Sequence, residues 1–185
     1  MKREVIKYGD PVLRRKAEAI EKVDERVSQL ACDLLETLQA CNGLGLAAQQ
    51  VGAAVAICVI DVPPELDTGE EDGPRENPDV QMPLILLNPR ITEAAGTEIR
   101  LEGCLSFPEI FVPVARAAEL TAEFEDLGMG KRRLRVRGLL ARVVQHELDH
   151  LNAVLLVDRM SPLKRISLAG RLKKIRRESL ASAKS

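Results

Sequence analysis

The two histidines of this chain are four residues apart, in the run Q-H-E-L-D-H at residues 145–150. On a helix this spacing places His146 and His150 on one face, where two imidazole nitrogens can bind one metal ion. Glu147 lies at the edge of that face, within reach of a bound water molecule. The motif therefore predicts metal-assisted hydrolysis. The alternative is an amphipathic helix with two incidental histidines.

A third ligand is needed, because a catalytic centre of the zinc type uses three protein ligands and leaves one coordination position open. We favour Cys104. Gly103 precedes it in the chain and lets the backbone pass close to other groups, which makes a purely structural role for this thiol less natural. Metal binding would deprotonate the thiol. A buried cysteine in a strand is the alternative.

The run G-L-G-L-A-A-Q-Q at residues 43–50 contains glycines but matches neither nucleotide-binding fingerprint, because it lacks the Lys-Ser/Thr ending and the flanking strand and helix. Its small residues instead suit a backbone that lies close to an extended substrate, with the Gln50 amide as a hydrogen-bond donor. The alternative is a tight turn with an exposed Gln50.

The composition excludes several classes of function. At 185 residues, 45% of them hydrophobic, the chain has the size of one domain with its own core. Its 27 basic and 28 acidic residues nearly cancel, and one Tyr, three Phe and no Trp leave few stacking platforms for nucleic acid. We expect no DNA partner and an aliphatic core.

The remaining cysteines and the lack of long apolar runs bear on location. No C-x-x-C pair occurs, and Cys32, Cys41 and Cys58 stand in apolar contexts, so we expect all three in the core as free thiols. No secretory signal opens the chain, and no apolar run approaches the roughly 18 residues that span a bilayer. We expect a cytoplasmic protein with no membrane partner.

The periodicity of apolar residues predicts the elements that position these side chains. Helices are expected over residues 24–41, 139–152 and 161–180, the second of which carries the histidines. Strands are expected over residues 55–60, 84–87, 91–101, 112–124 and 134–136. This order predicts a single α+β domain over residues 1–185, with mixed or antiparallel β-sheets around a central metal-binding helix and with N-terminal and C-terminal helices.

Two segments differ from the rest in composition. Residues 61–82 contain four prolines and eight acidic residues against one Arg, which predicts a mobile acidic surface loop. Residues 161–185 contain eight Lys or Arg and one Glu, which predicts a basic C-terminal helix and tail. This basic helix either contacts the phosphates of ribosomal RNA or exposes its charges to solvent.

Three blocks together resemble the peptide deformylases, which remove the formyl group from the N-terminal methionine of new polypeptides. In order they are residues 43–50, E-G-C-L-S at residues 102–106, and Q-H-E-L-D-H-L at residues 145–151. The similarity covers most of the chain. Ala153 stands where the family commonly has Gly, and Phe111 where some members have a basic residue.

The resemblance implies a role for each residue of these blocks. The metal ligands would be Cys104, His146 and His150, and Glu147 would be the general acid and base. The formyl oxygen would face the Gln50 side-chain amide and the Leu105 backbone N–H, and Gly45 would pair its backbone with the substrate. By position beside the motifs, the methionine pocket is expected to be lined by Leu44, Leu139 and Val143. Glu102 could brace the cysteine loop through Arg116 or Arg142, or be solvated.

The cofactor is one divalent metal ion, and a Cys and two His accept Fe²⁺, Zn²⁺, Ni²⁺ or Co²⁺. The resemblance suggests Fe²⁺ in the cell, with N-formylmethionyl peptides and nascent chains as substrates. Two alternatives stay open. A zinc metalloprotease would take its third ligand downstream, where Asp158 and Glu178 are the only acidic residues. A non-catalytic module would have a closed structural metal site.

Overall fold

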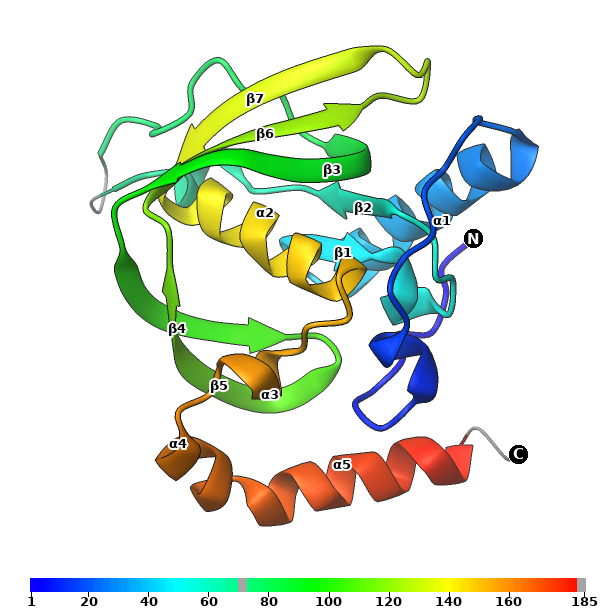
Figure 1. Cartoon of the computed structure of the whole chain (residues 1–185), viewed down its shortest axis with the longest axis vertical. Helices are drawn as coiled ribbons and strands as arrows, with labels where there is room; N and C mark the ends of the chain where they lie inside the picture. Colours follow the sequence, from blue (N-terminus) through cyan, green and yellow to red (C-terminus); the bar gives the residue numbers. More distant parts are fainter. Residues whose placement is uncertain (70–72, 183–185) are drawn as a thin grey trace.

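The helix that carries both histidines lies at the centre of the fold (Figure 1). The computed structural model describes residues 1–69 and 73–182. Helix α2 (Gly138–Leu151) begins one residue before the predicted start, at a glycine with a φ of 60°. Its apolar side packs on the larger β-sheet, which leaves the opposite side for the histidines.

One departure from the family pattern, Ala153 in place of Gly, lies at the end of α2. The Ala153 N–H donates to the His150 carbonyl at 3.0 Å and the Val154 N–H to the Asp149 carbonyl at 2.8 Å, which is the Schellman arrangement. Ala153 has a φ of 61°, in the left-handed region that favours glycine. The alanine therefore strains this turn.

We predict that Ala153→Gly stabilises the protein by about 1 kcal/mol, because a side chain in the left-handed region costs roughly 1–2 kcal/mol. Urea denaturation measures the change. Ala40→Gly is the matched control, since Ala40 is the last residue of a right-handed helix, where glycine destabilises by roughly 0.5–1 kcal/mol. Equal losses of stability in both variants would contradict the prediction.

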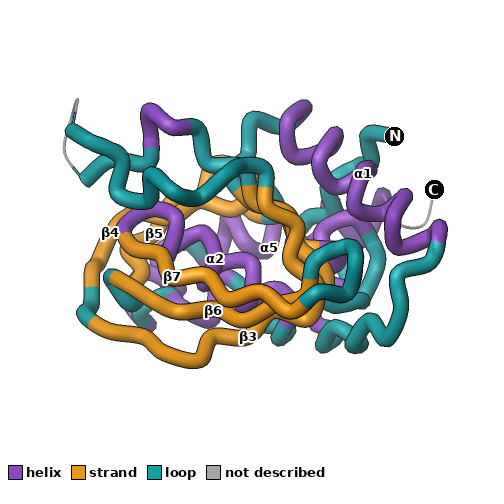
Figure 2. Tube along the Cα trace, turned by 90° about the horizontal axis from the view of Figure 1, so that it is seen from above, coloured by secondary structure: helices purple, strands orange, loops and turns teal. Residues whose placement is uncertain are grey.

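The strands form two antiparallel sheets. The larger has the order β1-β2-β3-β6-β7 and consists of β1 (Gly45–Ala47), β2 (Ile57–Ile60), β3 (Leu84–Ala95), β6 (Glu119–Glu125) and β7 (Lys131–Arg137). The smaller pairs β4 (Glu98–Cys104) with β5 (Phe107–Arg116). Seen from above, β3, β6 and β7 form one layer beside α2 (Figure 2). The predicted α+β class with a central helix is confirmed.

Two predicted strands are wrong in extent, because each is two strands. The expected strand 91–101 turns at Gly96, whose φ is 66°, and separates into β3 and β4. The expected strand 112–124 separates into β5 and β6 at Ala117, whose N–H and C=O both bond to the Gln145 side chain, at 2.9 and 3.0 Å. The chain thereby passes from one sheet to the other.

The helices near the two ends pack on opposite parts of the molecule. Helix α1 (Glu25–Ala40) agrees with the helix expected over residues 24–41, and the Asp24 carboxylate caps its start by accepting from the Val27 N–H. The expected helix 161–180 is instead α4 (Pro162–Ser167) followed by α5 (Ala169–Ser182), preceded by the short α3 (Leu156–Arg159). Short 3-10 turns at Pro11–Arg14, Ala48–Val51 and Pro64–Leu66 complete the described elements.

The core is mainly aliphatic and divides into three clusters of buried side chains. Strand β2 is buried on both sides, with Cys58 and Ile60 towards α2 and Ile57 and Val59 towards α1. The third cluster packs β5 against the segment that contains α3 and α5. Of the three cysteines expected in the core, only Cys58 is fully buried. Cys32 is exposed, because it lies outside the buried face of α1, whereas Cys41 at the end of this helix is half-buried and packs against the core.

The acidic segment 61–82 is anchored at the start of α2. Asp67 and Asn77 are buried, and the Asn77 amide donates to the Asp67 carboxylate at 2.6 Å and to the Arg137 carbonyl at 3.1 Å. The expectation of a mobile excursion is therefore wrong for these residues. Residues 70–72 of this segment, and residues 183–185 of the basic tail, lie outside the described residues.

Candidate metal centre

The three predicted metal ligands come together between α2 and the end of β4. The Cys104 Sγ lies 3.3 Å from the His150 Nε2, and one donor atom from each of Cys104, His146 and His150 lies within 4.8 Å of the others. Four-coordinate sites with bonds of about 2.0–2.3 Å bring ligand atoms to such separations. A sulfur and two imidazole nitrogens fit a divalent transition metal and leave a coordination position free.

The charges of these ligands suit metal binding. Burial by itself would raise the pKa of the Cys104 thiol, but the neighbouring His150 and His146 imidazoles outweigh burial and hold this pKa well below its usual range. Burial would lower the pKa of His146, whereas its contacts with Cys104 and Glu102 raise it well above its usual range. The site thus holds a thiolate beside a protonated His146 imidazole, whose proton a metal ion would displace.

Glu102 fixes the orientation of the first histidine. Its carboxylate lies 3.1 Å from the His146 Nδ1, so that the opposite ring nitrogen faces Cys104. Both arginines considered from the sequence reach it, Arg116 through two bonds of 3.0 Å and Arg142 through one of 2.7 Å. Burial opposes ionisation of Glu102, but His146 and Arg116 lower its pKa to about 2. The carboxylate therefore stays charged.

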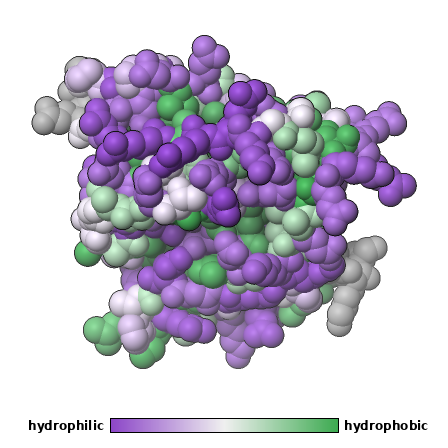
Figure 3. All heavy atoms as spheres, turned by 45° about the horizontal axis from the view of Figure 1, so that its top comes forward, coloured by the Kyte–Doolittle hydropathy of each residue, from purple (hydrophilic) through white to green (hydrophobic). Residues whose placement is uncertain are grey.

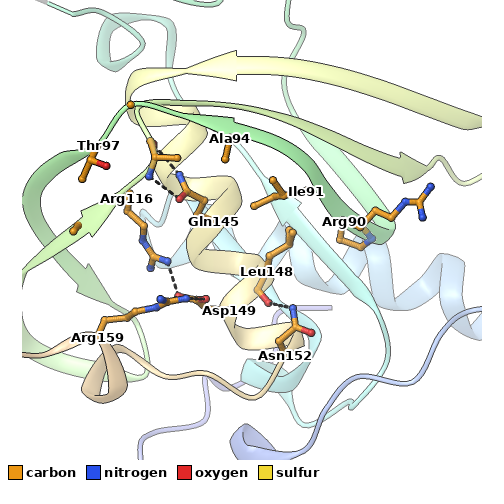
Figure 4. Close-up of a pocket in the computed structure, with 14 residues that line it drawn as sticks. Arg90, Ile91, Ala94, Thr97, Arg116, Gln145, Leu148, Asp149, Asn152 and Arg159 are labelled. Carbon is orange, nitrogen blue, oxygen red and sulfur yellow. Dashed lines mark hydrogen bonds and ion pairs between the residues drawn. The ribbon is translucent and has the colours of Figure 1, made fainter.

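The ion-pair network continues to the far side of α2. The Arg116 Nη1 also donates to the Asp149 carboxylate at 2.5 Å, and Asp149 accepts from the Arg159 Nε at 2.9 Å (Figure 4). These residues line an open groove of about 610 Å³. The sequence patterns did not indicate Asp149 or Arg159. The only signal for Asp149 was its position beside His150 in the motif.

Glu147 is buried beside the ligands, with 2% of its surface exposed. Burial raises the pKa of this carboxyl to about 7, and its Oε2 has no hydrogen-bond partner among the described residues. Strand β1 packs directly against it. A Cβ on Gly45 would lie 2.4 Å from the Glu147 Oε1, so the strand can come this close only because residue 45 is a glycine.

We predict that Gly45→Ala lowers the kcat/KM of the hydrolysis that the resemblance implies by about 10²-fold, because the added methyl displaces the Glu147 carboxylate and misplacement of about 1 Å has such an effect. Steady-state release of formate from formyl peptides, the substrates that the resemblance implies, measures the loss. Gly170→Ala is the control, since a Cβ there meets no atom within 4 Å. Full activity in Gly45→Ala would show that the position of the carboxylate does not matter.

The Gln50 side chain is fixed with its donor towards the site. Because the Ala47 N–H donates to the Gln50 Oε1 at 2.9 Å, the Nε2 must point the other way, towards the Cys104 Sγ at 3.6 Å and the Ser106 Oγ at 3.3 Å. Gln50 is 1% exposed, so the alternative of an exposed glutamine is wrong. The neighbouring Gln49, which the sequence did not single out, donates to the His150 carbonyl at 2.9 Å.

A cavity of about 530 Å³ opens onto this cluster. Its lining includes all the predicted site residues except His150: Leu44, Gly45, Gln50, Cys104, Leu105, Leu139, Val143, His146 and Glu147. Downstream, Asp158 pairs with Arg14 instead of approaching the histidines. The third ligand thus comes from upstream of the helix, unlike the arrangement that the protease alternative requires.

An α+β domain that clusters a cysteine and two histidines next to a buried glutamate, with a cavity opening onto them, has the site of a metal-dependent hydrolase. Comparison with known proteins identifies which kind. Residues 2–166 match the polypeptide deformylase family, and the chain belongs to this family. Its members remove the N-formyl group from nascent peptides and depend on a metal ion. The resemblance of the three sequence blocks is confirmed.

Relatives and solved structures agree over nearly the whole chain. The peptide deformylase of Dictyoglomus thermophilum is 46% identical in a match that covers 86% of this chain and 93% of the relative. The peptide deformylase of Opitutus terrae is 44% identical in a match that covers 97% of this chain and 96% of the relative. The crystal structure of the Ehrlichia chaffeensis peptide deformylase matches with a TM-score of 0.82 and 32% identity, covering 94% of this chain and 96% of that one. The crystal structure of the Thermotoga maritima peptide deformylase matches with a TM-score of 0.75 and 37% identity, covering 88% of this chain and 99% of that one.

Proposed function

We propose that this chain deformylates nascent polypeptides with Glu147 as general acid and base and with Cys104, His146 and His150 as metal ligands. The observation that carries the proposal is the buried Glu147 carboxyl beside the three ligands, with an Oε2 that has no hydrogen-bond partner among the described residues. Burial favours the protonated carboxyl by raising its pKa, which suits a group that must accept a proton and return it. The bound metal ion supplies Lewis acidity, which polarises the formyl group and acidifies water.

Glu147 handles the proton in both halves of the reaction. It accepts a proton as water oxygen bonds to the formyl carbon, and it donates that proton to the nitrogen as the C–N bond breaks, because an amine anion cannot leave at neutral pH. The products are formate and a free amino group. The Gln50 Nε2 and the Leu105 backbone N–H donate to the formyl oxygen as negative charge develops there, and each such donor contributes about 10²–10³ in rate.

The cavity lining suits a methionine side chain. Leu44, Leu139 and Val143 provide apolar contacts, and the Gly45 backbone pairs with the peptide. The room for the acyl group beside Glu147 is small, since a Cβ on Gly45 would lie 2.4 Å from the Glu147 Oε1. The site therefore accepts formyl and excludes acetyl, which is larger by one methyl group.

Fe²⁺ is the proposed metal in the cell, and the same donors accept Zn²⁺, Ni²⁺ or Co²⁺. The test of function is a formate assay on protein purified without air, with metal analysis of the same sample. Formyl-Met peptides should release formate, matched acetyl-Met peptides should not, and air should inactivate the iron form. Cleavage of internal peptide bonds would indicate a protease, and a metal-loaded protein inert towards both substrates would indicate a structural metal module.

The basic C-terminal segment is proposed to contact ribosomal RNA, which would hold the enzyme near nascent chains in the cytoplasm. Helix α5 exposes Lys173, Arg176 and Arg177, but Leu168 and Leu172 are buried in the core. Truncation would therefore damage the fold, and charge reversal is the better test. Lys173→Glu with Arg177→Glu should weaken ribosome binding at physiological salt, and unchanged affinity would refute the contact. Within the described residues, no helix combines the length and apolarity needed to cross a bilayer.

A further inference from the structure

The outward face of the β4–β5 hairpin is apolar and exposed. Ile99, Leu101 and Phe111 are 70%, 69% and 63% exposed, and the pairing places Ile99 opposite Ala115, Leu101 opposite Pro113 and Gly103 opposite Phe111 on the same face. We call these six residues the hairpin face. An antiparallel sheet with one face on the core normally presents polar residues on the other. Contiguous exposed apolar surface of this kind marks an interaction site.

The larger sheet shows the usual pattern. Its exposed side chains form ion pairs across neighbouring strands, such as Arg90 with Glu123 at 2.6 Å and Arg135 with Glu119 at 3.1 Å. The upper half of Figure 3, where the top of the molecule is turned forward, is mainly hydrophilic. The hairpin face thus differs from the exposed face of the larger sheet.

The hairpin face begins at the mouth of the catalytic cavity. Leu101, Gly103 and Phe111 line this cavity together with His146 and Glu147. The Phe111 ring lies over the Gly103 backbone, since a Cβ on Gly103 would be 2.6 Å from a ring carbon. From there the face continues for four residues along β4, a distance of about 13 Å at strand spacing.

These dimensions match an extended peptide that leaves the cavity. Side chains on one side of an extended chain recur about every 6.8 Å, which is also the spacing of alternate residues on the hairpin face. A second copy of the chain is a poorer occupant, because contact with Leu101 and Phe111 would cover the opening through which substrate enters. The continuity with the cavity favours the substrate itself.

On the basis of the proposed function, we propose that the hairpin face binds apolar side chains of the substrate downstream of formyl-methionine, and that it makes the enzyme selective for nascent chains with apolar residues there. Ile99 and Leu101 supply aliphatic contacts and Phe111 a flat ring at the boundary with the cavity. Covering about 60 Å² of apolar surface gives a preference of about tenfold.

The test compares two hexapeptides of equal length, formyl-Met-Ala-Ser-Leu-Phe-Leu and formyl-Met-Ala-Ser-Ser-Asn-Ser, whose first three residues present the same groups to the cavity. The wild-type chain should show about tenfold higher kcat/KM for the apolar peptide. In Ile99→Ser with Leu101→Ser this ratio should fall to about two or less, whereas Leu66→Ser, an exposed leucine elsewhere, should retain it.

Binding is measured apart from turnover, by fluorescence anisotropy of the labelled peptides with the Glu147→Gln chain. The Kd values of the two peptides should differ by the same factor of about ten. In the variant that combines Ile99→Ser and Leu101→Ser, this factor should fall to about two or less. A ratio near one in the wild type, an unchanged ratio in the double variant, or an equal loss on both peptides would overturn the inference. So would a wild-type dimer that the double variant loses in sedimentation. Absence of formate from both peptides would instead refute the proposed function.

Discussion

Glu147→Gln should lower kcat for formate release by about 10²–10⁴-fold, the range for loss of a positioned general acid and base. Glutamine has nearly the same shape as glutamate, so the packing against Gly45 is retained. The amide cannot accept the proton from water or return it to the departing nitrogen. Since both proton transfers of the proposed mechanism use the same carboxylate, the loss should appear in kcat as well as in kcat/KM.

The measurement requires metal analysis beside the assay, because a residue next to His146 could act through the metal. We expect Glu147→Gln to hold as much metal as the wild type, since the proposed ligand atoms come from Cys104, His146 and His150. Glu119→Gln is the matched control, because this carboxylate pairs with Arg135 on the outer face of the larger sheet. Activity near wild type in Glu147→Gln, with metal bound, would remove Glu147 from the mechanism.

Local spacing in the sequence was sufficient to predict the helical part of the site. The i and i+4 histidines and the apolar periodicity both belong to one continuous segment, so α2 and the orientation of its two ligands follow from helix geometry alone. The Gln50 contact is similarly local, because the Ala47 N–H that orients its amide is three residues away.

Features that depend on contacts between distant segments were not predictable in this way. The break between β5 and β6 falls at two alanines without any turn signal, and it is stabilised by Gln145, which lies 28 residues further along the chain. For Glu102 the sequence left two readings open, pairing with Arg116 or Arg142 and exposure to solvent, and it gave no sign of the contact with His146, which is 44 residues away. A pattern read within one segment contains no information on such pairs.

Glu102→Ala is expected to destabilise the protein by about 3–5 kcal/mol, because removal of one partner from a buried ion-pair network leaves the others uncompensated. Arg116 and Arg142 are 5% exposed each and both donate to this carboxylate. Arg116 retains Asp149, but Arg142 retains only the carbonyls of Val114 and Glu98. Urea denaturation of the metal-free protein measures the loss.

Metal affinity distinguishes the two roles of Glu102. Loss of a residue that orients a metal-bound histidine typically weakens metal binding by about 10–100-fold. Glu102→Gln keeps an oxygen that can accept from the His146 Nδ1, so it should bind metal more tightly than Glu102→Ala while sharing much of the loss in stability. The control is Glu98→Ala on the same strand, whose exposed side chain pairs only with Arg100 among the ion pairs of the described residues. If both Glu102 variants bind metal as the wild type does, the carboxylate stabilises the fold and does not position His146.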